Sequence, residues 1–232
     1  MRRIFPDPAE DPDLIQAYAY PVDHWLRVNM VASADGAAWV KGLSGGLSGK
    51  GDRRIFGVLR GLADVIVAGA ATVRAEGYGP AKPREGREVP PPIAVVTRRM
   101  DLDLGGTLFT EARTRTIVIT CEAAPRDRVE AAAELADVIV AGGDRVDFPA
   151  AVEFLRMRGL TRILCEGGPR INAQLAADDL IDELCLTVSP LLIGGVAARI
   201  LNGEASHVPL RLTQVLEEDG VLFQRYVRER AR

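Results

Sequence analysis

The stretch Thr161-Arg-Ile-Leu-Cys-Glu-Gly-Gly-Pro169 predicts a short β-strand over residues 161–165 that ends at a glycine turn, with a helix following near 170–177. The stretch Asp64-Val-Ile-Val-Ala-Gly-Ala-Ala-Thr72 has the same order of strand, glycine turn and short helix. Apolar runs without alternation are typical of strands that are buried on both faces of a sheet. Two such units indicate an α/β protein in which helices cover a mostly parallel sheet.

The segments around these two units continue the alternation of strands and helices. Alternating apolar residues from Trp25 onward predict a strand, and an amphipathic helix is predicted from the apolar stripe Ile55, Val58, Leu59 and Leu62. Further strands are predicted over 92–97, 116–120, 137–141 and 182–188, and helices over 126–134 and 148–158. The dipeptide Asp219-Gly220 predicts a closing β-hairpin over 209–229, which makes the sheet mixed. We therefore expect one α/β domain over 24–232, with helices on both faces of the sheet, after an extension rich in Pro and Asp over 1–23.

The composition narrows the class of protein. Of the 232 residues, 47% are hydrophobic and 26% are charged, which excludes a chain that is disordered throughout. The net charge of −3 and the 5% aromatic content disfavour nucleic acid and anionic membranes as partners. No run approaches the roughly 18 apolar residues of a membrane helix. Three cysteines, widely spaced, suit a reduced protein, so we expect a cytoplasmic location.

The motif scan removes several kinds of chemistry. The zinc-deaminase and HExxH patterns are absent, and with only His24 and His207 in the chain no metal site is expected. The Rossmann pattern GxGxxG is also absent. The segment Gly46-Leu-Ser-Gly-Lys-Gly51 fails as a phosphate-binding P-loop, because Gly51 follows the lysine where Ser or Thr is required.

One hydrolase pattern does match. Gly42-Leu-Ser44-Gly-Gly46 fits GxSxG, the nucleophile elbow of serine hydrolases, and His207 would complete a Ser…Asp…His order. The elbow needs a buried strand before the serine and a helix directly after it, whereas here a second glycine-rich turn follows. A hydrolase that acts through Ser44 is therefore the minor alternative.

The two glycine turns lie where ligands bind in α/β proteins, beyond the carboxyl ends of strands. Backbone N–H groups at a helix N-terminus hold anions, and glycine lets a phosphate approach the backbone closely. Two such turns in one sheet indicate a phosphate-bearing ligand of dinucleotide size. The alternative is that these glycines only turn the chain.

Five motifs follow one another in a fixed order. They are Val28-Asn-Met-Val-Ala-Ser-Ala-Asp-Gly36, then Ser44 and Arg60, then 64–72, then 166–169, and finally Asp182-Glu-Leu-Cys-Leu-Thr-Val-Ser-Pro190 with Gly194-Gly195. In this order and spacing, over about residues 24–228, the chain resembles the reductase domain of the bacterial riboflavin-biosynthesis deaminase/reductase and its stand-alone relatives. That resemblance implies the three-layer fold of dihydrofolate reductase.

The resemblance also implies an activity. Members of that family use NADPH to reduce the ribosyl group of 5-amino-6-(ribosylamino)pyrimidinedione 5′-phosphate to a ribityl chain by hydride transfer, and they are usually homodimers. By the same resemblance, Glu166 and Asn29 take catalytic positions, with Glu166 orienting the substrate or assisting proton transfer. The implied substrate-binding positions are Ser44, Arg60, Pro80 and Glu166. The implied cofactor-binding positions are Val31, Gly46, Gly69, Thr72, Glu76, Thr97, Arg98, Gly167, Gly168, Pro169, Arg170, Ile171 and Asn172, with Thr97 and Arg98 beside the adenosine 2′-phosphate.

Some positions depart from the family pattern or permit another interpretation. Asn29 stands where many members have lysine, and Gly46 stands where many have a tryptophan. The stretch Pro80-Ala-Lys-Pro83 replaces a Leu…Arg substrate clamp, for which Lys82 or Arg84 would have to substitute. Arg60 lies off the apolar stripe of its helix, so a solvated arginine fits the pattern equally well. Two alternative functions therefore stay open. One is a reductase of the same fold that acts on a pteridine, and the other is a binding protein that keeps the dinucleotide site without turnover.

Overall fold

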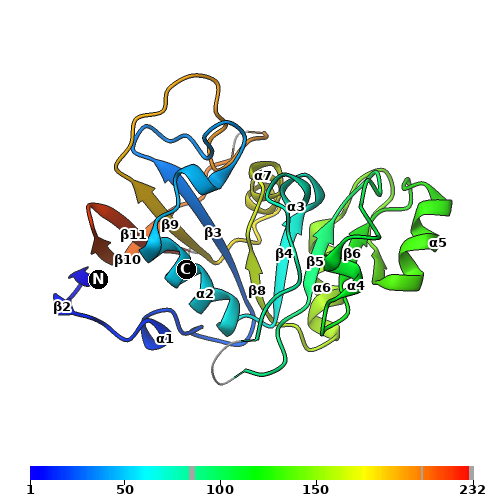
Figure 1. The fold of residues 1–232 in the computed structure, drawn as a ribbon, viewed down its shortest axis with the longest axis horizontal. Helices are drawn as coiled ribbons and strands as arrows, with labels where there is room; N and C mark the ends of the chain where they lie inside the picture. Colours follow the sequence, from blue (N-terminus) through cyan, green and yellow to red (C-terminus); the bar gives the residue numbers. More distant parts are fainter. Residues whose placement is uncertain (84–86, 205, 230–232) are drawn as a thin grey trace.

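An eleven-stranded twisted sheet with helices on both faces forms the body of the computed structural model, which describes residues 1–83, 87–204 and 206–229 (Figure 1). The strands are β1 (Arg2–Phe5), β2 (Ala9–Glu10), β3 (Trp25–Ser33), β4 (Val65–Gly69), β5 (Ile93–Val96), β6 (Ile117–Thr120), β7 (Asp137–Val140), β8 (Arg162–Cys165), β9 (Glu183–Ser189), β10 (Leu210–Glu218) and β11 (Val221–Arg228). The helices are α1 (Leu14–Ala17), α2 (Lys50–Leu62), α3 (Ala70–Ala75), α4 (Thr107–Thr110), α5 (Arg126–Leu135), α6 (Phe148–Met157) and α7 (Pro169–Ala177), with a 3-10 turn, η1, over Ser44–Gly46.

The strand order is β2-β1-β10-β11-β9-β3-β8-β4-β5-β6-β7. Neighbouring strands from β9 to β7 run parallel. From β9 toward the other edge of the sheet, each pair of neighbours (β9/β11, β11/β10, β10/β1 and β1/β2) is antiparallel. The predicted mixed sheet with a closing hairpin is confirmed. Asp219 and Gly220 link β10 to β11 with positive φ angles of 55° and 79°, the conformation that this dipeptide favours.

Strand β4 shows why the sheet is covered on both sides. All five of its residues are buried, and they alternate between two hydrophobic clusters. Ile66 and Ala68 belong to the cluster that includes apolar residues of α2, α3, α4 and α5, whereas Val65 and Val67 belong to the cluster packed by α6 and α7. Full burial of an aliphatic side chain contributes about 1.5–3 kcal/mol, so both faces of β4 need a covering layer.

The N-terminal segment packs on the edge of the sheet. Strand β1 pairs with β10, and β2 pairs with β1. The carboxylate of Asp13 accepts hydrogen bonds from the N–H groups of Ile15 and Gln16 and so caps α1. Neither edge strand nor α4 was predicted from the sequence, because these elements are two to four residues long and lack a periodic pattern.

A buried ion cluster fastens the amino-terminal half of β3. Arg27 and Glu183 are both fully buried, and their ion pair has an N–O distance of 2.8 Å. Arg225 of β11 donates to the same carboxylate at 2.8 Å. Burial opposes the charge on Glu183, but the two guanidinium groups outweigh it and lower the pKa of the carboxyl. The cluster thus joins β3, β9 and β11 near the amino-terminal end of β3.

Two long loops rise above the carboxyl end of β3. The loop before α2 and the loop after β9 lie side by side (Figure 1), and the Ala38 N–H donates to the Ala198 carbonyl at 2.8 Å. Asp35 accepts hydrogen bonds from the Ser33 hydroxyl and from the N–H groups of Gly194 and Ile193, which lower its pKa to about 2. These contacts join the loop before α2 to the loop after β9, and the two loops together are called the loop wall. None of the described helices is long and apolar enough to cross a membrane.

Candidate active site

The glycine turns after β4 and β8 meet at the carboxyl edge of the sheet. The Gly69 N–H donates to the Gly167 carbonyl at 2.8 Å, which joins the two turns directly. A Cβ atom on Gly69 would lie 2.9 Å from Ile171 Cδ1, and one on Gly168 would lie 2.7 Å from Thr72 Oγ1. Close approach therefore favours glycine at both positions, because any larger residue would have to displace Ile171 or Thr72, and Gly168 is the N-cap residue of α7.

A pocket of about 450 Å³ opens beside these turns. It lies between the loop wall, α2, α3 and the carboxyl ends of β3 and β8. Its lining residues are Asn29, Met30, Val31, Ala38, Trp39, Gly42, Ser44, Gly45, Ser48, Asp52, Arg53, Phe56, Ala71, Thr72, Ala75, Glu76, Tyr78, Glu166, Gly168 and Pro169. The structure thus brings together eight of the predicted residues from four separate segments: Asn29, Val31, Ser44, Thr72, Glu76, Glu166, Gly168 and Pro169.

A cluster of the half-buried Arg60 and Tyr78 around the buried Glu166 lies at one side of the pocket. The Arg60 guanidinium donates through Nε and Nη2 to the two oxygens of Glu166, each at 2.7 Å. The Tyr78 hydroxyl donates to the same carboxylate at 2.7 Å. The side chains of Arg60 and Glu166 are only 16% and 2% exposed, so Arg60 is not a solvated arginine.

Electrostatics fixes the charge states within this cluster. Burial opposes the charge on Arg60, but the Glu166 carboxylate outweighs that effect and raises the pKa of the guanidinium. Burial and the charge of Glu166 hold the pKa of Tyr78 well above its ordinary value, so the phenol stays protonated as a donor. Sequence reasoning did not single out Tyr78, since its place after α3 in a glycine-rich stretch carries no pattern of its own. The cluster presents an oriented carboxylate to the pocket.

The serine of the GxSxG pattern has a different setting from a nucleophile elbow. Ser44 begins the 3-10 turn η1, and its backbone N–H donates to Glu76 Oε1 at 2.7 Å. His207 is exposed, and no hydrogen bond joins it to Ser44 in the part of the chain that the structure describes. Gly46 belongs to the same turn, while the indole of Trp39 lines the pocket from the preceding loop. Among the described residues, no group of three or more His, Cys, Asp or Glu side chains is placed to hold a metal ion.

Several predicted residues lie outside this pocket. Thr97 is buried at the end of β5, and its hydroxyl accepts a hydrogen bond from the Met100 N–H at 3.0 Å, while Arg98 beside it is exposed. Ile171 and Asn172 are buried, and the Asn172 amide donates to the Ile200 carbonyl at 2.9 Å. Their backbone N–H groups both donate to the Gly168 carbonyl, at 2.9 and 3.2 Å, so neither the side chains nor the N–H groups of these two residues are available to a ligand.

Pro80 lines a neighbouring groove of about 640 Å³ that also includes Arg60, Lys82 and Arg113. Arg60 therefore lies between the pocket and this groove. Arg84, which the sequence offered as a substitute for the missing clamp, lies outside the described residues. Lys82 is described and lines the groove.

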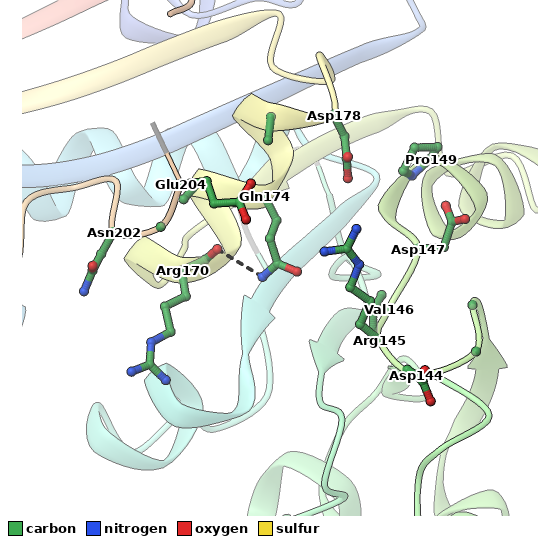
Figure 2. A pocket seen from close by; sticks show the side chains of 15 residues that line it. Asp144, Arg145, Val146, Asp147, Pro149, Arg170, Gln174, Asp178, Asn202 and Glu204 are labelled. Atoms are coloured by element: carbon green, nitrogen blue, oxygen red, sulfur yellow. Dashed lines mark hydrogen bonds between the residues drawn. The ribbon is translucent and has the colours of Figure 1, made fainter. Parts of the chain in front are cut away.

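A third groove, of about 1120 Å³, lies on the side of α7 (Figure 2). Arg170 and Gln174 extend from α7 toward it, and the Gln174 amide donates to the Arg170 carbonyl at 3.1 Å. The opposite side is formed by the loop before α6, with Asp144, Arg145 and Asp147. Arg170, in the first turn of α7, thus lies between the glycine turn and this groove.

The comparisons with known proteins define first a fold and then a family. A dihydrofolate reductase from Enterococcus faecalis, solved with NADP(H), superposes with a TM-score of 0.50 at 12% identity, over 89% of this chain and 97% of that enzyme. The fold is therefore that of dihydrofolate reductase, as predicted. A pyrimidine reductase-like protein from Corynebacterium diphtheriae superposes with a TM-score of 0.82 at 27% identity, over 94% of this chain and 99% of the other.

The RibD C-terminal domain family matches residues 24–221, and this chain belongs to that family. A relative from Archaeoglobus fulgidus, named 2,5-diamino-6-ribosylamino-4(3H)-pyrimidinone 5′-phosphate reductase, is 30% identical over 181 residues, which cover 74% of this chain and 82% of that reductase. The family resemblance stated from the motifs is thus confirmed, and with it the assignment to a family of reductases.

Proposed function

We propose that this protein reduces the ribosylamino group of a 6-(ribosylamino)pyrimidine 5′-phosphate to a ribitylamino group, with NADPH as the reductant. The observation that carries the proposal is the pocket in which the joined glycine turns meet the Arg60–Glu166–Tyr78 cluster. Joined glycine turns suit a dinucleotide, and the Arg60–Glu166–Tyr78 cluster suits a polar substrate that must be held in one orientation. The named reductases among the relatives support the same substrate class.

The residues at the glycine turns fit a dinucleotide cofactor. A Cβ atom on Gly168 would lie 2.7 Å from Thr72 Oγ1, so only a glycine lets a ligand approach the backbone here without moving Thr72. Pro169, the first residue of α7, has no N–H, and the N–H groups of Ile171 and Asn172 donate to the Gly168 carbonyl, so the Arg170 N–H and the positive end of the helix dipole are what α7 would offer a diphosphate. Val31, Trp39 and Thr72 would border the nicotinamide end, because they line the pocket next to this turn. The nicotinamide, when bound, supplies the hydride. The protein supplies the enclosure and the orientation.

The adenosine end of the cofactor has two candidate contacts. Arg98, exposed at the end of β5, would pair with a 2′-phosphate, and Arg170 lines the groove beside α7 (Figure 2). Thr97 is buried, and its hydroxyl accepts a hydrogen bond from the Met100 N–H, so it supports the turn that carries Arg98. We therefore assign the charge recognition at this end to Arg98.

The substrate would lie across the Arg60–Glu166–Tyr78 cluster. Glu166 holds Arg60 through two of its nitrogen atoms, and Nη1 of Arg60 makes no hydrogen bond within the described ranges. That nitrogen, with Lys82 and Arg113 in the neighbouring groove, would hold the 5′-phosphate. Ser44 and Asn29 line the pocket and offer polar groups to the ribose and the ring. Glu166, whose oxygens already accept three hydrogen bonds, orients the substrate.

A direct assay tests this function. Oxidation of NADPH is followed at one enzyme concentration with the ribosylaminopyrimidine phosphate and, separately, with dihydrofolate. We expect turnover with the pyrimidine and none with dihydrofolate. Turnover with dihydrofolate alone would favour the pteridine alternative. Tight NADPH binding without turnover on either compound would favour a binding protein.

The cofactor preference gives a first prediction. NADPH is expected to bind about 10- to 100-fold more tightly than NADH, because hydrogen bonds to a charged group contribute about 1.5–3 kcal/mol. The preference should shrink in high salt and nearly vanish in Arg98→Gln, since both depend on the 2′-phosphate charge. Fluorescence titration measures the two dissociation constants. Arg126→Gln, an exposed arginine of α5, should leave both unchanged; equal affinities for the two nucleotides at low salt would contradict the assignment.

We also propose that the protein works as a cytoplasmic homodimer. Leu192 and Val196 in the loop after β9 are 82% and 95% exposed, which supports an apolar contact between copies there. The three cysteines are free and buried, as suits a reducing compartment. Light scattering on the purified protein measures the mass of the assembly.

A further inference from the structure

Besides Glu166 and Glu76, the pocket holds a third oriented carboxylate, that of Asp52. Asp52 lies in the first turn of α2 and lines the pocket. The Ser48 hydroxyl donates to its Oδ2 at 2.5 Å, and the Thr187 hydroxyl donates to its Oδ1 at 2.6 Å. These donors come from the loop wall and from β9, so the carboxylate is fixed from two sides. Within the described part of the chain, no lysine or arginine forms an ion pair with it.

This arrangement leaves Asp52 able to accept but unable to donate. Each carboxylate oxygen has two acceptor positions, and one hydroxyl occupies only one of them. A polar ring placed against Asp52 must therefore present hydrogen-bond donors on the facing edge, because a carbonyl oxygen there would be repelled. Phe56, one turn along α2, lines the same pocket, which suits a planar ring.

The two pyrimidines that fit the proposed function differ at this edge. A 2-amino-4-oxopyrimidine presents its 2-amino N–H and its ring N3–H side by side, which matches the two oxygens of a carboxylate. The corresponding 2,4-dioxopyrimidine presents the O2 carbonyl beside the N3–H, which sets an acceptor against an acceptor. Resting on the proposed function, we infer that Asp52 recognises the N2–N3 edge of the pyrimidine and selects the 2-amino substrate over its 2-oxo counterpart.

A structural role for Asp52 gives a different expectation. An aspartate in the first turn also stabilises a helix through the helix dipole, and the N-cap residue Gly49 makes no side-chain cap bond. If Asp52 only supported α2, its replacement would reduce catalysis on both pyrimidines to the same extent. The ratio of the two specificity constants therefore separates recognition from support.

The experiment measures kcat/KM with NADPH for the 2-amino compound and for the same compound with an oxo group at position 2. We expect the wild type to prefer the 2-amino compound by about 10²-fold or more, because a site built for a hydrogen-bond donor rejects an analogue that lacks it. Asp52→Asn presents one acceptor and one donor, so the preference should fall at least tenfold or reverse. Asp127→Asn, at the equivalent first turn of α5, should leave the ratio unchanged.

Other outcomes remain decisive. Wild-type turnover of both compounds with equal kcat/KM would overturn the inference and leave the proposed function standing, whereas turnover of neither would overturn the proposed function itself. If Asp52→Asn does not fold, Thr187→Val removes one of the two orienting hydroxyls and should reduce the preference several-fold. A ratio that stays constant in Thr187→Val and moves in Glu76→Gln would assign the recognition to Glu76 instead.

Discussion

Replacing Glu166 with glutamine is expected to lower turnover about 10²–10⁴-fold while NADPH still binds. The carboxylate accepts from Arg60 twice and from Tyr78 once, all at 2.7 Å, and an amide can accept through one oxygen only. The cluster would then lose the orientation that holds substrate against the nicotinamide end of the pocket. Steady-state reduction of the ribosylaminopyrimidine phosphate, beside an NADPH titration, measures both effects.

The same change should also lower stability by about 3–5 kcal/mol, since it leaves the buried Arg60 without a counter-ion. Glu183→Gln is the matched control, because it breaks the other buried ion cluster at the amino-terminal half of β3. It should lose comparable stability and keep near-normal turnover below its melting temperature. Near-normal turnover in folded Glu166→Gln would remove Glu166 from the site, and loss of NADPH binding would place it on the cofactor side.

Replacing Gly168 with valine is expected to weaken NADPH binding about 10²-fold or more. A Cβ atom there would lie 2.7 Å from the Thr72 hydroxyl oxygen, so the side chain must displace Thr72 and extend into the space where the diphosphate approaches α7. Its φ of −73° is accessible to valine, so the fold should survive. Isothermal titration with NADPH measures the loss.

Gly49 provides the control for this variant. It is the N-cap of α2 with a φ of −106°, and a Cβ atom there would meet nothing within 4 Å. Gly49→Val should therefore bind NADPH as the wild type does. Unchanged affinity in folded Gly168→Val would mean that the glycine serves the turn between β8 and α7 and not the ligand.

The helices, strands and turns that could be predicted have a recognisable sequence pattern within their own residues. Strands β4 and β8 are apolar on both faces, and α2 and α6 each show a stripe of apolar residues, so their sequences alone predict their type. The glycine turns were predictable for the same reason, because Gly69 and Gly167-Gly168 stand directly after apolar runs. The hairpin at Asp219-Gly220 needs only its dipeptide.

The contacts that make the site are not local, and for that reason the sequence could not supply them. Arg60 and Glu166 are 106 positions apart, and nothing in the helical pattern of α2 distinguishes a buried, paired arginine from a solvated one. Tyr78 and Asp52 reach the pocket only because the fold brings α2, β9 and the loop after α3 together. Which side chains share a pocket depends on the tertiary structure, while which segments are helices or strands depends mostly on their neighbours in sequence.

The position of β3 in the sheet has a consequence for the order in which the chain can fold. β3 ends at residue 33, yet its partners in the sheet are β8 and β9, which end at residues 165 and 189. During translation β3 stays unpaired until β8 and β9 have been synthesised. Pairings between segments distant in sequence also form slowly, because a large loop has to close first. The nascent chain therefore exposes an unpaired strand during that interval, and unpaired strand edges make such a species prone to aggregation. The pocket, which Asn29 and Val31 of that strand line, cannot form before these partners are present.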